Sequence, residues 1–417
     1  MLGSIPRRDN ATMLAHEGLE EGPLRGFRAR GDPLGDRVAA ALHATEGGLM
    51  EIHDLLGQVR RRASSVGLPT KFLSDEEAEA NAACSAFVRE AQEAPPWANF
   101  KKMERAQALL SALMPLNFIS LGLGSLLGVG GQFPKMGDIV RATGMLNSKR
   151  KEGEERLDRT SAFVLSLMRP SETGEQAAVQ SPLKPGGSGH DEILRIRLLH
   201  GAVRVFVKQS GRYHEENEVP ICQHDLGITL GLFSYIHLRN LRRLGVYLGR
   251  EDVESHLLLW RYVGHNLGVE RELLDTFFTD FDAQRRFFHA STLLVGDGCE
   301  KAGHEIVASF RANAARLSKS TYGVIPSTFA FNFMMGIMVH LGGKEYMGKL
   351  PGIEEYTGRS WSVGATRMIG GAASFIDRHL PFGTRLLSYL NFSLARASAK
   401  RKGHGTERRQ HRLRAKL

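Results

Sequence analysis

Arg197, His200 and Arg204 place two guanidiniums and an imidazole in the mostly apolar segment 192–207. At about 100° per residue in an α-helix, these positions and Lys208 fall within an arc of about 80°. The rest of the circumference is apolar, whereas an ordinary surface helix shows a broad polar face. We therefore expect most of this helix to be buried. Its polar stripe would face either water or a group inside the protein. Such a group would bind a nitrogen ligand and would be favoured by the positive charges beside it.

A second polar stripe lies on the predicted helix 152–168, where Arg156, Arg159 and Thr160 are spaced i, i+3 and i+4 and so share one face. Two such faces could oppose one another across a cavity. A neutral imidazole on a buried helix is a suitable axial ligand for haem iron, and guanidiniums can neutralise the haem propionates or polarise bound dioxygen. From the residues alone, two other interpretations stay open. These are a hydrogen-bonded core histidine for His200 and a solvated charged face for Arg156 and Arg159.

Other kinds of chemistry are disfavoured by the motifs that the sequence lacks. No Glu precedes a His by three residues, as the E-x-x-H pairs of di-iron bundles require, and HEIVA at His304 is not H-E-x-x-H. The sequence contains no G-x-S-x-G and no G-K-[ST], and GLGSLLG at 122–128 misses G-x-G-x-x-G by one residue. Common hydrolase, nucleoside-triphosphatase and dinucleotide-binding functions are therefore not indicated.

The net charge of +10 comes mainly from the C-terminal end. Residues 396–417 hold nine Lys or Arg against one acid, Glu407, which gives +8 and leaves +2 for the other 395 residues. This distribution predicts a neutral globule with a solvated basic tail and no specific nucleic-acid partner. Peripheral contact of the tail with an anionic membrane is an alternative.

The cysteines and the N-terminal residues bear on the compartment. Cys84, Cys222 and Cys299 form no C-x-x-C pair, which suits a reducing compartment and excludes covalent C-x-x-C-H haem attachment. The first residues include an Arg pair but no apolar stretch typical of a signal peptide. We expect an intracellular protein, cytoplasmic or peripheral on an internal membrane, that is not secreted.

Two uncharged runs, 106–131 and 322–343, reach the length of a bilayer span. The first contains Pro115 and Asn117, and the second contains Pro326, Asn332 and His340. Bilayer spans tolerate such residues only where neighbouring groups satisfy them. We expect both runs to be core helices.

Helical periodicity runs through most of the chain and strand alternation is weak, which predicts an all-α fold. A Pro-, Gly- and Ser-rich stretch at 169–189 is interpreted as a flexible surface loop and not as a domain boundary. The predicted organisation is a variable, partly disordered N-terminal region over 1–65, a helical domain over 66–395 and a disordered basic tail over 396–417. Within the first region, we expect 1–36 to be poorly ordered. The main predicted helices are 37–62, 74–92, 97–113, 135–146, 152–168, 192–207, 225–245, 250–267, 270–290, 291–317 and 359–376.

Five segments occur in a recognisable order: RLDRT at 156–160, RLLHGAVR at 197–204, VPICQHDLGIT at 219–229, LRRLG at 241–245 and WRYVGHNLG at 260–268. In this order and spacing, they resemble the domain shared by the latex-clearing rubber oxygenases and the endoplasmic-reticulum-bound oxygenases of mycophenolic acid biosynthesis. The resemblance is strong over roughly a quarter of the chain and looser over roughly three quarters.

The resemblance implies a globin-like helical core that holds non-covalent haem b. It also implies an oxygenase that uses dioxygen to cleave or oxidise a carbon–carbon double bond of an isoprenoid or similar apolar substrate. The proximal iron ligand of the family falls on His200, and its neighbouring cofactor-binding arginines fall on Arg197 and Arg204. The distal, catalytic side falls on Arg156 and Thr160, with Arg159 beside them.

This chain departs from the family in three ways. The rubber oxygenases have, in place of Arg159, a Lys that can cap the distal iron, and a guanidinium is a poor metal ligand. Their distal glutamate has no clear counterpart, because GDIVRATGML at 137–146 offers only Asp138. They are also exported, whereas this chain shows no export signal, so a small prenyl or fatty chain fits better as substrate than an insoluble polymer.

Two alternative functions stay open at this stage. The first is a non-catalytic haem-binding protein of the same fold. The second is a membrane-associated helical protein without cofactor, which would use the basic tail and the amphipathic segment 380–402.

Overall fold

The computed structural model describes residues 21–45, 54–65, 73–133, 151–168, 181–211, 218–294, 300–320, 324–347 and 360–379. Within these ranges every regular element is a helix and none is a strand, which confirms the predicted all-α fold. Four short elements depart from α-helical geometry: the 3-10 segments η1 (Phe27–Ala29) and η4 (Gly130–Gln132), and the π-helical segments η3 (Ile119–Val129) and η5 (Leu232–Ile236). The α-helices are α2 Glu21–Gly26, α3 Pro33–Ala44, α4 Leu55–Ser64, α5 Asp75–Gln92, α6 Phe100–Ala112, α7 Met114–Phe118, α9 Lys151–Met168, α10 Ser188–Gln209, α11 Gln223–Gly231, α12 His237–Arg243, α13 Arg250–Asn266, α14 Arg271–Phe277, α15 Phe281–Leu294, α16 Glu300–Ser320, α17 Ser327–Met347 and α18 Ser360–His379.

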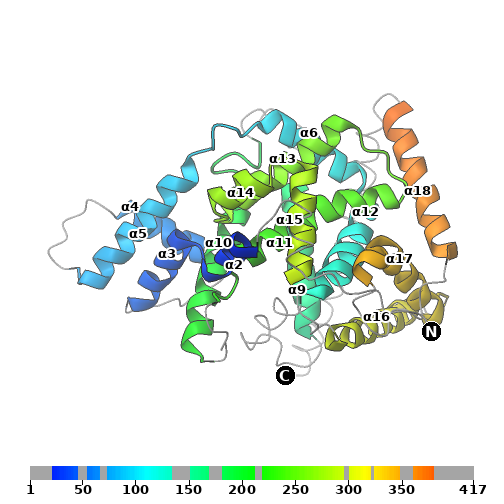
Figure 1. The fold of residues 1–417 in the computed structure, drawn as a ribbon. Helices are drawn as coiled ribbons and strands as arrows, with labels where there is room; N and C mark the ends of the chain where they lie inside the picture. Colours follow the sequence, from blue (N-terminus) through cyan, green and yellow to red (C-terminus); the bar gives the residue numbers. More distant parts are fainter. Residues whose placement is uncertain are drawn as a thin grey trace, which may run out of the picture.

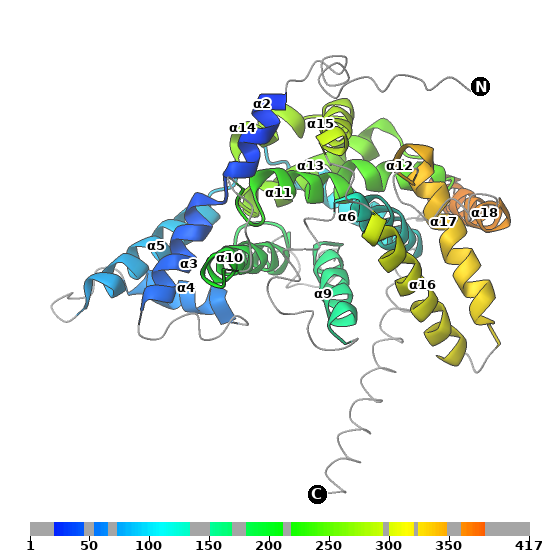
Figure 2. The same cartoon turned by 60° about the horizontal axis from the view of Figure 1, so that its bottom comes forward.

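The helices are arranged around a central group with an extension on each side (Figures 1 and 2). Helix α5 packs on α3 and on α4, and α3 and α4 pack on α10; we call these three helices the N-terminal arm. On the opposite side, α16, α17 and α18 pack in sequence, and α17 also covers η3. Helices α9, α11 and α13 lie between the two extensions.

The N-terminal arm has a hydrophobic cluster of its own. Val38, Val59, Cys84 and Phe87 are fully buried in this cluster, and Leu198 of α10 is buried with them. Burying large apolar side chains in this way stabilises the contact by about 1.5–3 kcal/mol for each side chain. The arm is therefore held to α10 by apolar packing as well as by the polar contacts described below.

The largest cluster fills the centre of the molecule. It joins Phe163 and Leu167 of α9, Ile193 of α10, Phe233 of η5 and Trp260 of α13. Helices α9 and α10 contact each other and lie side by side in Figure 2. The two helices that carry the polar stripes are thus neighbours, as expected if the stripes serve one site.

The π-helical segment η3 packs on η5 and on α12, and buried polar groups join it to α12. In η3, Ser120 Oγ lies 2.7 Å from Nδ1 of His237. The amide of Asn240 donates to the Ser120 carbonyl and to the hydroxyl of Ser125. Wide helical turns are often found where a helix must accommodate such local contacts.

Several observed boundaries differ from those predicted by periodicity. The predicted helix 37–62 is two helices in the structure. The first, α3, begins at Pro33 and ends at Ala44, and the second, α4, begins at Leu55. The predicted helix 270–290 is also divided, since the Asp280 carboxylate accepts the backbone N–H groups of Asp282 and Ala283 and thereby starts α15. The predicted helix 135–146, residues 169–180 of the linker and the basic tail lie outside the described residues.

The two uncharged runs supply core helices in the described part of the chain. Residues of η3, including Leu121 and Ser125, and residues of α17, including Met335 and Leu341, are buried. Among the helices described, no single one is long and apolar enough to cross a bilayer. Only a bent pair, Phe100–Ala112 with Leu116–Gln132 at 93°, meets the length and composition criteria when taken together.

Candidate functional site

The polar residues of helix α10 lie on two adjacent sides of the helix. Arg197, Gly201 and Arg204 are spaced i, i+4 and i+7, so they share the side that packs on α3. Gly201 lets the helices approach closely, since a Cβ at this position would lie 2.6 Å from the carbonyl oxygen of Gly35. His200 is one residue before Gly201 and therefore lies on a neighbouring side of α10, where its side chain is half-buried. The stripe predicted from the sequence is thus divided between a face against the N-terminal arm and the side that carries His200.

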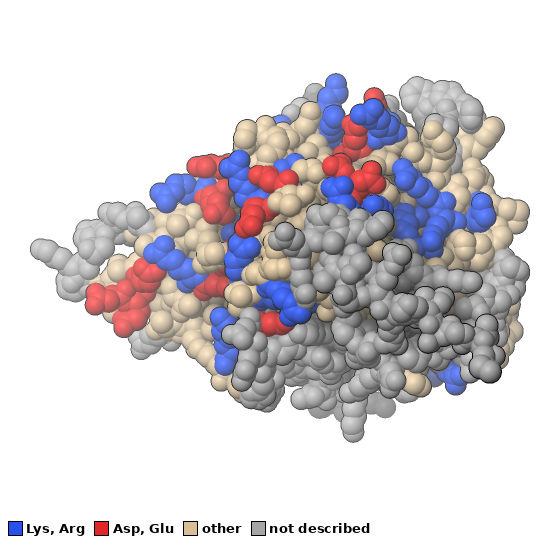
Figure 3. Space-filling model, in the orientation of Figure 1, with Lys and Arg blue, Asp and Glu red and all other residues tan. Residues whose placement is uncertain are grey.

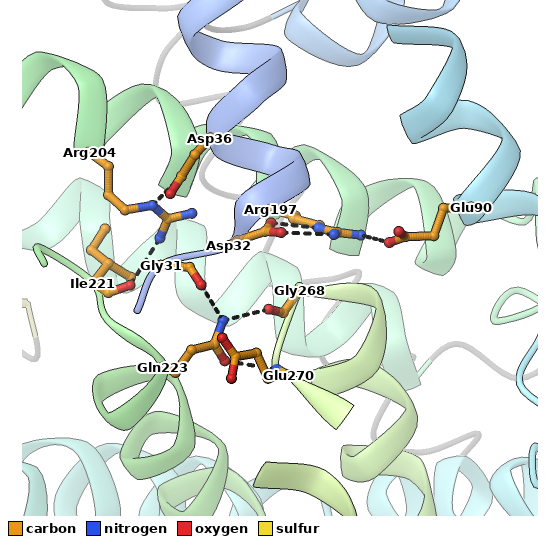
Figure 4. Close-up of polar contacts among 10 residues, drawn as sticks. All are labelled: Gly31, Asp32, Asp36, Glu90, Arg197, Arg204, Ile221, Gln223, Gly268 and Glu270. Atoms are coloured by element: carbon orange, nitrogen blue, oxygen red, sulfur yellow. Dashed lines mark hydrogen bonds and ion pairs between the residues drawn. The ribbon is translucent and has the colours of Figure 1, made fainter. Parts of the chain in front are cut away.

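Arg197 is buried and binds two carboxylates from the arm and the loop before it (Figure 4). Its Nε and Nη2 donate to the two oxygens of Asp32 at 2.7 and 2.9 Å, and its Nη1 donates to Glu90 at 2.8 Å. Burial alone lowers the pKa of Arg197, but the hydrogen bonds and charges of Asp32 and Glu90 together raise it above its usual value. Arg197 therefore joins the middle of α10 to the start of α3 and to the last turns of α5.

Arg204 makes a second connection one to two turns further along α10. Its Nε donates to Asp36 of α3, and its Nη1 donates to the carbonyl oxygen of Ile221 at 2.9 Å (Figure 4). Ile221 has φ +51°, a conformation that costs a β-branched residue about 1–3 kcal/mol. The bond from Arg204 helps to hold this strained loop against α10. Within the described residues, Nη2 of Arg204 is buried without a hydrogen-bond partner.

Gln223 connects the same region to the loop after α13. Its Nε2 donates to the carbonyls of Gly31 and Gly268 at 2.6 and 2.9 Å, and its Oε1 accepts the backbone N–H of Glu270 at 2.8 Å (Figure 4). Gly268 has φ +82°, and a Cβ there would lie 2.4 Å from Asp32 Oδ2 and 2.7 Å from Arg197 Nε. Gln223 and Gly268 both belong to the motifs that suggested the family. In this structure they fix the backbone around the Asp32–Arg197 ion pair.

Helix α9 supplies the other predicted residues. Thr160 lies in α9 with a half-buried side chain, and Phe163, one turn further on, is buried in the central cluster. Arg156 and Arg159 occupy the preceding turn of the same helix, but their side chains lie outside the described part of the structure, as does Asp138. The backbone of α9 thus brings Arg156, Arg159 and Thr160 to the helix that neighbours α10.

The carboxylates that hold the α10 arginines were not found by the sequence analysis. Residues 21–36, for which the composition predicts poor order, form α2, η1 and the start of α3. Asp32 is the N-cap residue of α3, yet its side chain makes no capping bond because both carboxylate oxygens bind Arg197. The pair Asp32–Pro33 is a recognisable helix start, since Pro is favoured in the first turn. That signal locates the helix but does not indicate the ion pair.

The other histidines make local contacts. Nε2 of His256 lies 3.1 Å from the Phe233 carbonyl oxygen, and Nε2 of His340 lies 3.2 Å from the Arg243 carbonyl oxygen. His237 contacts Ser120, as described above, and the ring of His265 packs edge-on against Trp97 at 5.9 Å between centroids. His289 is half-buried on α15, and His304 is exposed on α16. Nowhere in the described residues do three or more His, Cys, Asp or Glu side chains form a group suited to a metal ion.

The side chains that α9 and α10 carry fit the chemical needs of a haem. A macrocycle needs apolar surroundings, and the central cluster supplies Phe163, Leu167 and Ile193 from these two helices. An iron ligand is available in the half-buried imidazole of His200. Propionates need cationic donors, and Arg204 retains a buried Nη2 that binds no described residue. All nitrogens of Arg197, in contrast, already bind Asp32 or Glu90.

An all-helical chain with an imidazole and fixed arginines on one central helix is the type of protein that the sequence motifs suggested. The chain belongs to the family described as "ER-bound oxygenase mpaB/B'/Rubber oxygenase, catalytic domain", whose model matches residues 114–346. It is thus a member of an oxygenase family.

The fold is similar to a solved structure described as "Structure of Latex Clearing Protein LCP in the closed state". The two chains share 17% sequence identity with a TM-score of 0.51, and the match covers 92% of this chain and 95% of the other. At this identity, the likeness concerns the fold. No curated protein sequence matches the chain.

Proposed function

We propose that the chain is a haem b-dependent oxygenase that uses dioxygen to cleave or oxidise a carbon–carbon double bond of an isoprenoid or similar apolar substrate. The observation that carries the proposal is the position of His200. It is half-buried on a helix whose orientation is fixed by Arg197 and Arg204, and this helix neighbours α9 with Thr160. Membership of an oxygenase family supports the reaction class.

Each side chain has a separate role in this proposal. Haem would supply the activation of dioxygen at its iron. His200 would hold the iron from α10, and Arg204, together with Arg197 where its present carboxylate partners permit, would balance the propionate charges. Arg156, Arg159 and Thr160 on α9 would supply hydrogen-bond donors where negative charge develops during oxidation.

The surroundings of these helices support an apolar substrate. The central cluster contains aromatic and aliphatic side chains from α9, α10, α13 and α17, among them Met335 and Met338. Methionine side chains adapt readily to irregular apolar groups. A small prenyl or fatty chain within an intracellular compartment is the substrate class that we propose.

The decisive experiment is an ultraviolet–visible spectrum of the protein produced with added haemin, compared with His200→Ala. We expect a Soret band in the parent and a loss of most haem from His200→Ala. His304→Ala serves as the matched control, because His304 is an exposed histidine on α16. Equal haem content in the parent and in His200→Ala would overturn the assignment of His200, and no Soret band in the parent would overturn the haem proposal itself.

Oxygen consumption with an isoprenoid alkene then separates catalysis from haem binding. The presence of Arg159 in place of the Lys of the rubber oxygenases makes a haem-binding protein without turnover the second candidate. We expect oxygen uptake that depends on the alkene and on Thr160. A haem-loaded protein that consumes no oxygen with alkenes of several chain lengths would favour the second candidate.

A further inference from the structure

Helix α18 is attached to the molecule along one side by close backbone contacts. A Cβ at Gly370 would lie 2.1 Å from the Leu244 carbonyl oxygen, and a Cβ at Gly245, where φ is +87°, would lie 2.8 Å from the Arg367 carbonyl oxygen. Thr366, one turn before Gly370, is buried on the same side. This side of α18 is therefore fixed on the loop that follows α12, and α18 also contacts α17.

The opposite side of α18 is apolar and exposed. Met368 is 74% exposed, Ile369 is 55% exposed and Phe375 is 60% exposed. Gly364, Met368, Ala372 and Phe375 recur at helical spacing and form one stripe along the helix. Tyr247, which is 57% exposed, lies two residues beyond the Gly245 contact. Four of the nine exposed large apolar side chains in the described ranges thus lie on α18 or on this loop.

Positive charge lies beside this stripe. Arg367 of α18 is exposed and forms no ion pair with a described carboxylate. Arg242 of α12 is exposed as well, but its guanidinium lies over the ring of Phe281, 5.1 Å from the centroid, and so belongs to the neighbouring groove. Arg239 and Arg243 of α12 donate hydrogen bonds to backbone carbonyls of α17 at the same junction. Figure 3 shows Lys and Arg side chains gathered over the α12 part of that face. The chain that follows α18 is also basic, since residues 396–417 carry +8.

We propose that the apolar stripe of α18 and Tyr247, with Arg367, form a docking surface for the interface of an anionic lipid bilayer. We call this the α18 surface. An amphipathic helix at such an interface inserts its apolar side at the boundary of the acyl chains, while arginines bind the headgroup phosphates. A second copy of the chain fits less well, because a symmetric contact would bring the exposed Arg367 side chains of both copies together. The proposal is independent of the haem site.

The test is co-sedimentation of the full-length protein with lipid vesicles. Vesicles of phosphatidylcholine alone are compared with vesicles in which about a third of the lipid is phosphatidylserine. Phe375→Ser should weaken binding to the anionic vesicles by roughly tenfold, because the variant loses an aromatic side chain from the interface. The matched control is Phe329→Ser, since Phe329 is 51% exposed but lies on α17. It should bind like the parent.

A second pair of variants tests how much positive charge contributes to vesicle binding. Arg367→Gln should reduce binding to anionic vesicles by about fivefold, whereas Arg89→Gln, at an exposed position on α5, should not change it. Binding that is unchanged in both Phe375→Ser and Arg367→Gln would show that the basic tail acts alone and would overturn the α18 surface. A parent that binds no anionic vesicles, and whose self-association is abolished by Phe375→Ser, would also overturn it and would assign the face to a dimer.

A second readout locates the helix in the membrane directly. Phe375→Trp should become sensitive to quenching by lipids that carry bromine on the acyl chains, and Phe329→Trp should not. Each is compared with the parent to subtract the native tryptophans. Quenching that is equal in the two variants would contradict the proposed orientation.

Discussion

Asp32 and Arg197 form a two-pronged ion pair, with both carboxylate oxygens bound to the guanidinium at 2.7 and 2.9 Å, and both side chains are almost completely buried. Breaking such a pair by removing one partner leaves a charge buried without compensation and typically costs about 3–5 kcal/mol. Because Arg197 lies three residues before His200, the pair also sets the position of the proposed iron ligand.

Asp32→Asn is therefore expected to lower the free energy of unfolding by about 3 kcal/mol, as measured by urea denaturation. Asp282→Asn, an exposed carboxylate on α15, is the control and should change it by less than about 0.5 kcal/mol. Combining Asp32→Asn with Arg197→Met should cost less than the sum of the two single changes, because no fully buried charge is then left unpaired. Glu90 also loses its partner, but its side chain is 48% exposed and stays solvated. Strictly additive effects would show that the two side chains do not stabilise each other.

Gly268→Ala is expected to disturb the Asp32–Arg197 ion pair by crowding both side chains. The new methyl group would lie within 2.7 Å of both Asp32 Oδ2 and Arg197 Nε, in addition to the strain of φ +82°. Gly211→Ala isolates the strain alone, since Gly211 has φ +62° and nothing lies within 4 Å of its added Cβ. We expect Gly211→Ala to cost about 1 kcal/mol and Gly268→Ala to cost at least about 2 kcal/mol more. Equal losses in thermal or urea denaturation would argue that the ion pair adapts freely.

Arg204→Lys keeps the positive charge beside Asp36 but removes the planar donor that reaches the carbonyl of Ile221. We expect the strained loop at residues 218–222 to open more often, with amide hydrogen exchange about tenfold faster there. Arg195→Lys is the control on the same helix, because Arg195 is exposed and pairs with Glu192 three residues away. If exchange at 218–222 is equally slow in both variants, the Ile221 conformation does not depend on Arg204.

The stability of the protein should fall in mild acid because of buried histidines. Burial lowers the pKa of His256 to about 4, and burial followed by the charge of His256 lowers the pKa of the neighbouring His237 well below its usual value. The unfolded chain, in which a histidine has a pKa of about 6.5, takes up protons first as the pH falls. The contribution of these neutral histidines is thus complete above about pH 6.5 and is lost as the pH falls toward 4.

For His256 alone, the expected loss between pH 7 and pH 5 is on the order of 2 kcal/mol. His256→Gln should flatten this pH dependence of the unfolding free energy, whatever its effect on stability at pH 7. His43→Gln, at an exposed position on α3, should leave the slope unchanged. An equal slope in the parent and in His256→Gln would contradict the role of this residue.

The sequence predicted the helical class and the helices that bear the polar stripes, because apolar periodicity and helix length are local properties. It also predicted that the α10 helix is mostly buried, which holds only in part, since ten of its 22 residues are buried and Phe206 is 50% exposed. What it could not predict was the partner of each arginine. Asp32 and Asp36 lie more than 160 positions away along the chain, in a region whose composition suggested poor order, and only the packing of α3 on α10 brings them together.

The motif residues Gln223 and Gly268 illustrate the same limit. The segments that contain these two residues resemble the family, which indicated that both residues are important. Nothing in the sequence, however, distinguishes a residue that contacts a cofactor from one that fixes a loop. Three hydrogen bonds of Gln223 assign it to the second role. The proposed roles of His200, Arg156, Arg159 and Thr160 rest on the chemistry of their side chains and stay predictions.

The ion pairs that join α10 to α3 and α5 limit how far the chain can be shortened from its N-terminal side. The family match begins at residue 114, and a fragment trimmed to that point would lack Asp32, Asp36 and Glu90. The buried guanidiniums of Arg197 and Arg204 would then have none of the acidic partners that they bind in this structure. We therefore expect that the matched segment does not fold by itself, and that its expression alone yields insoluble material.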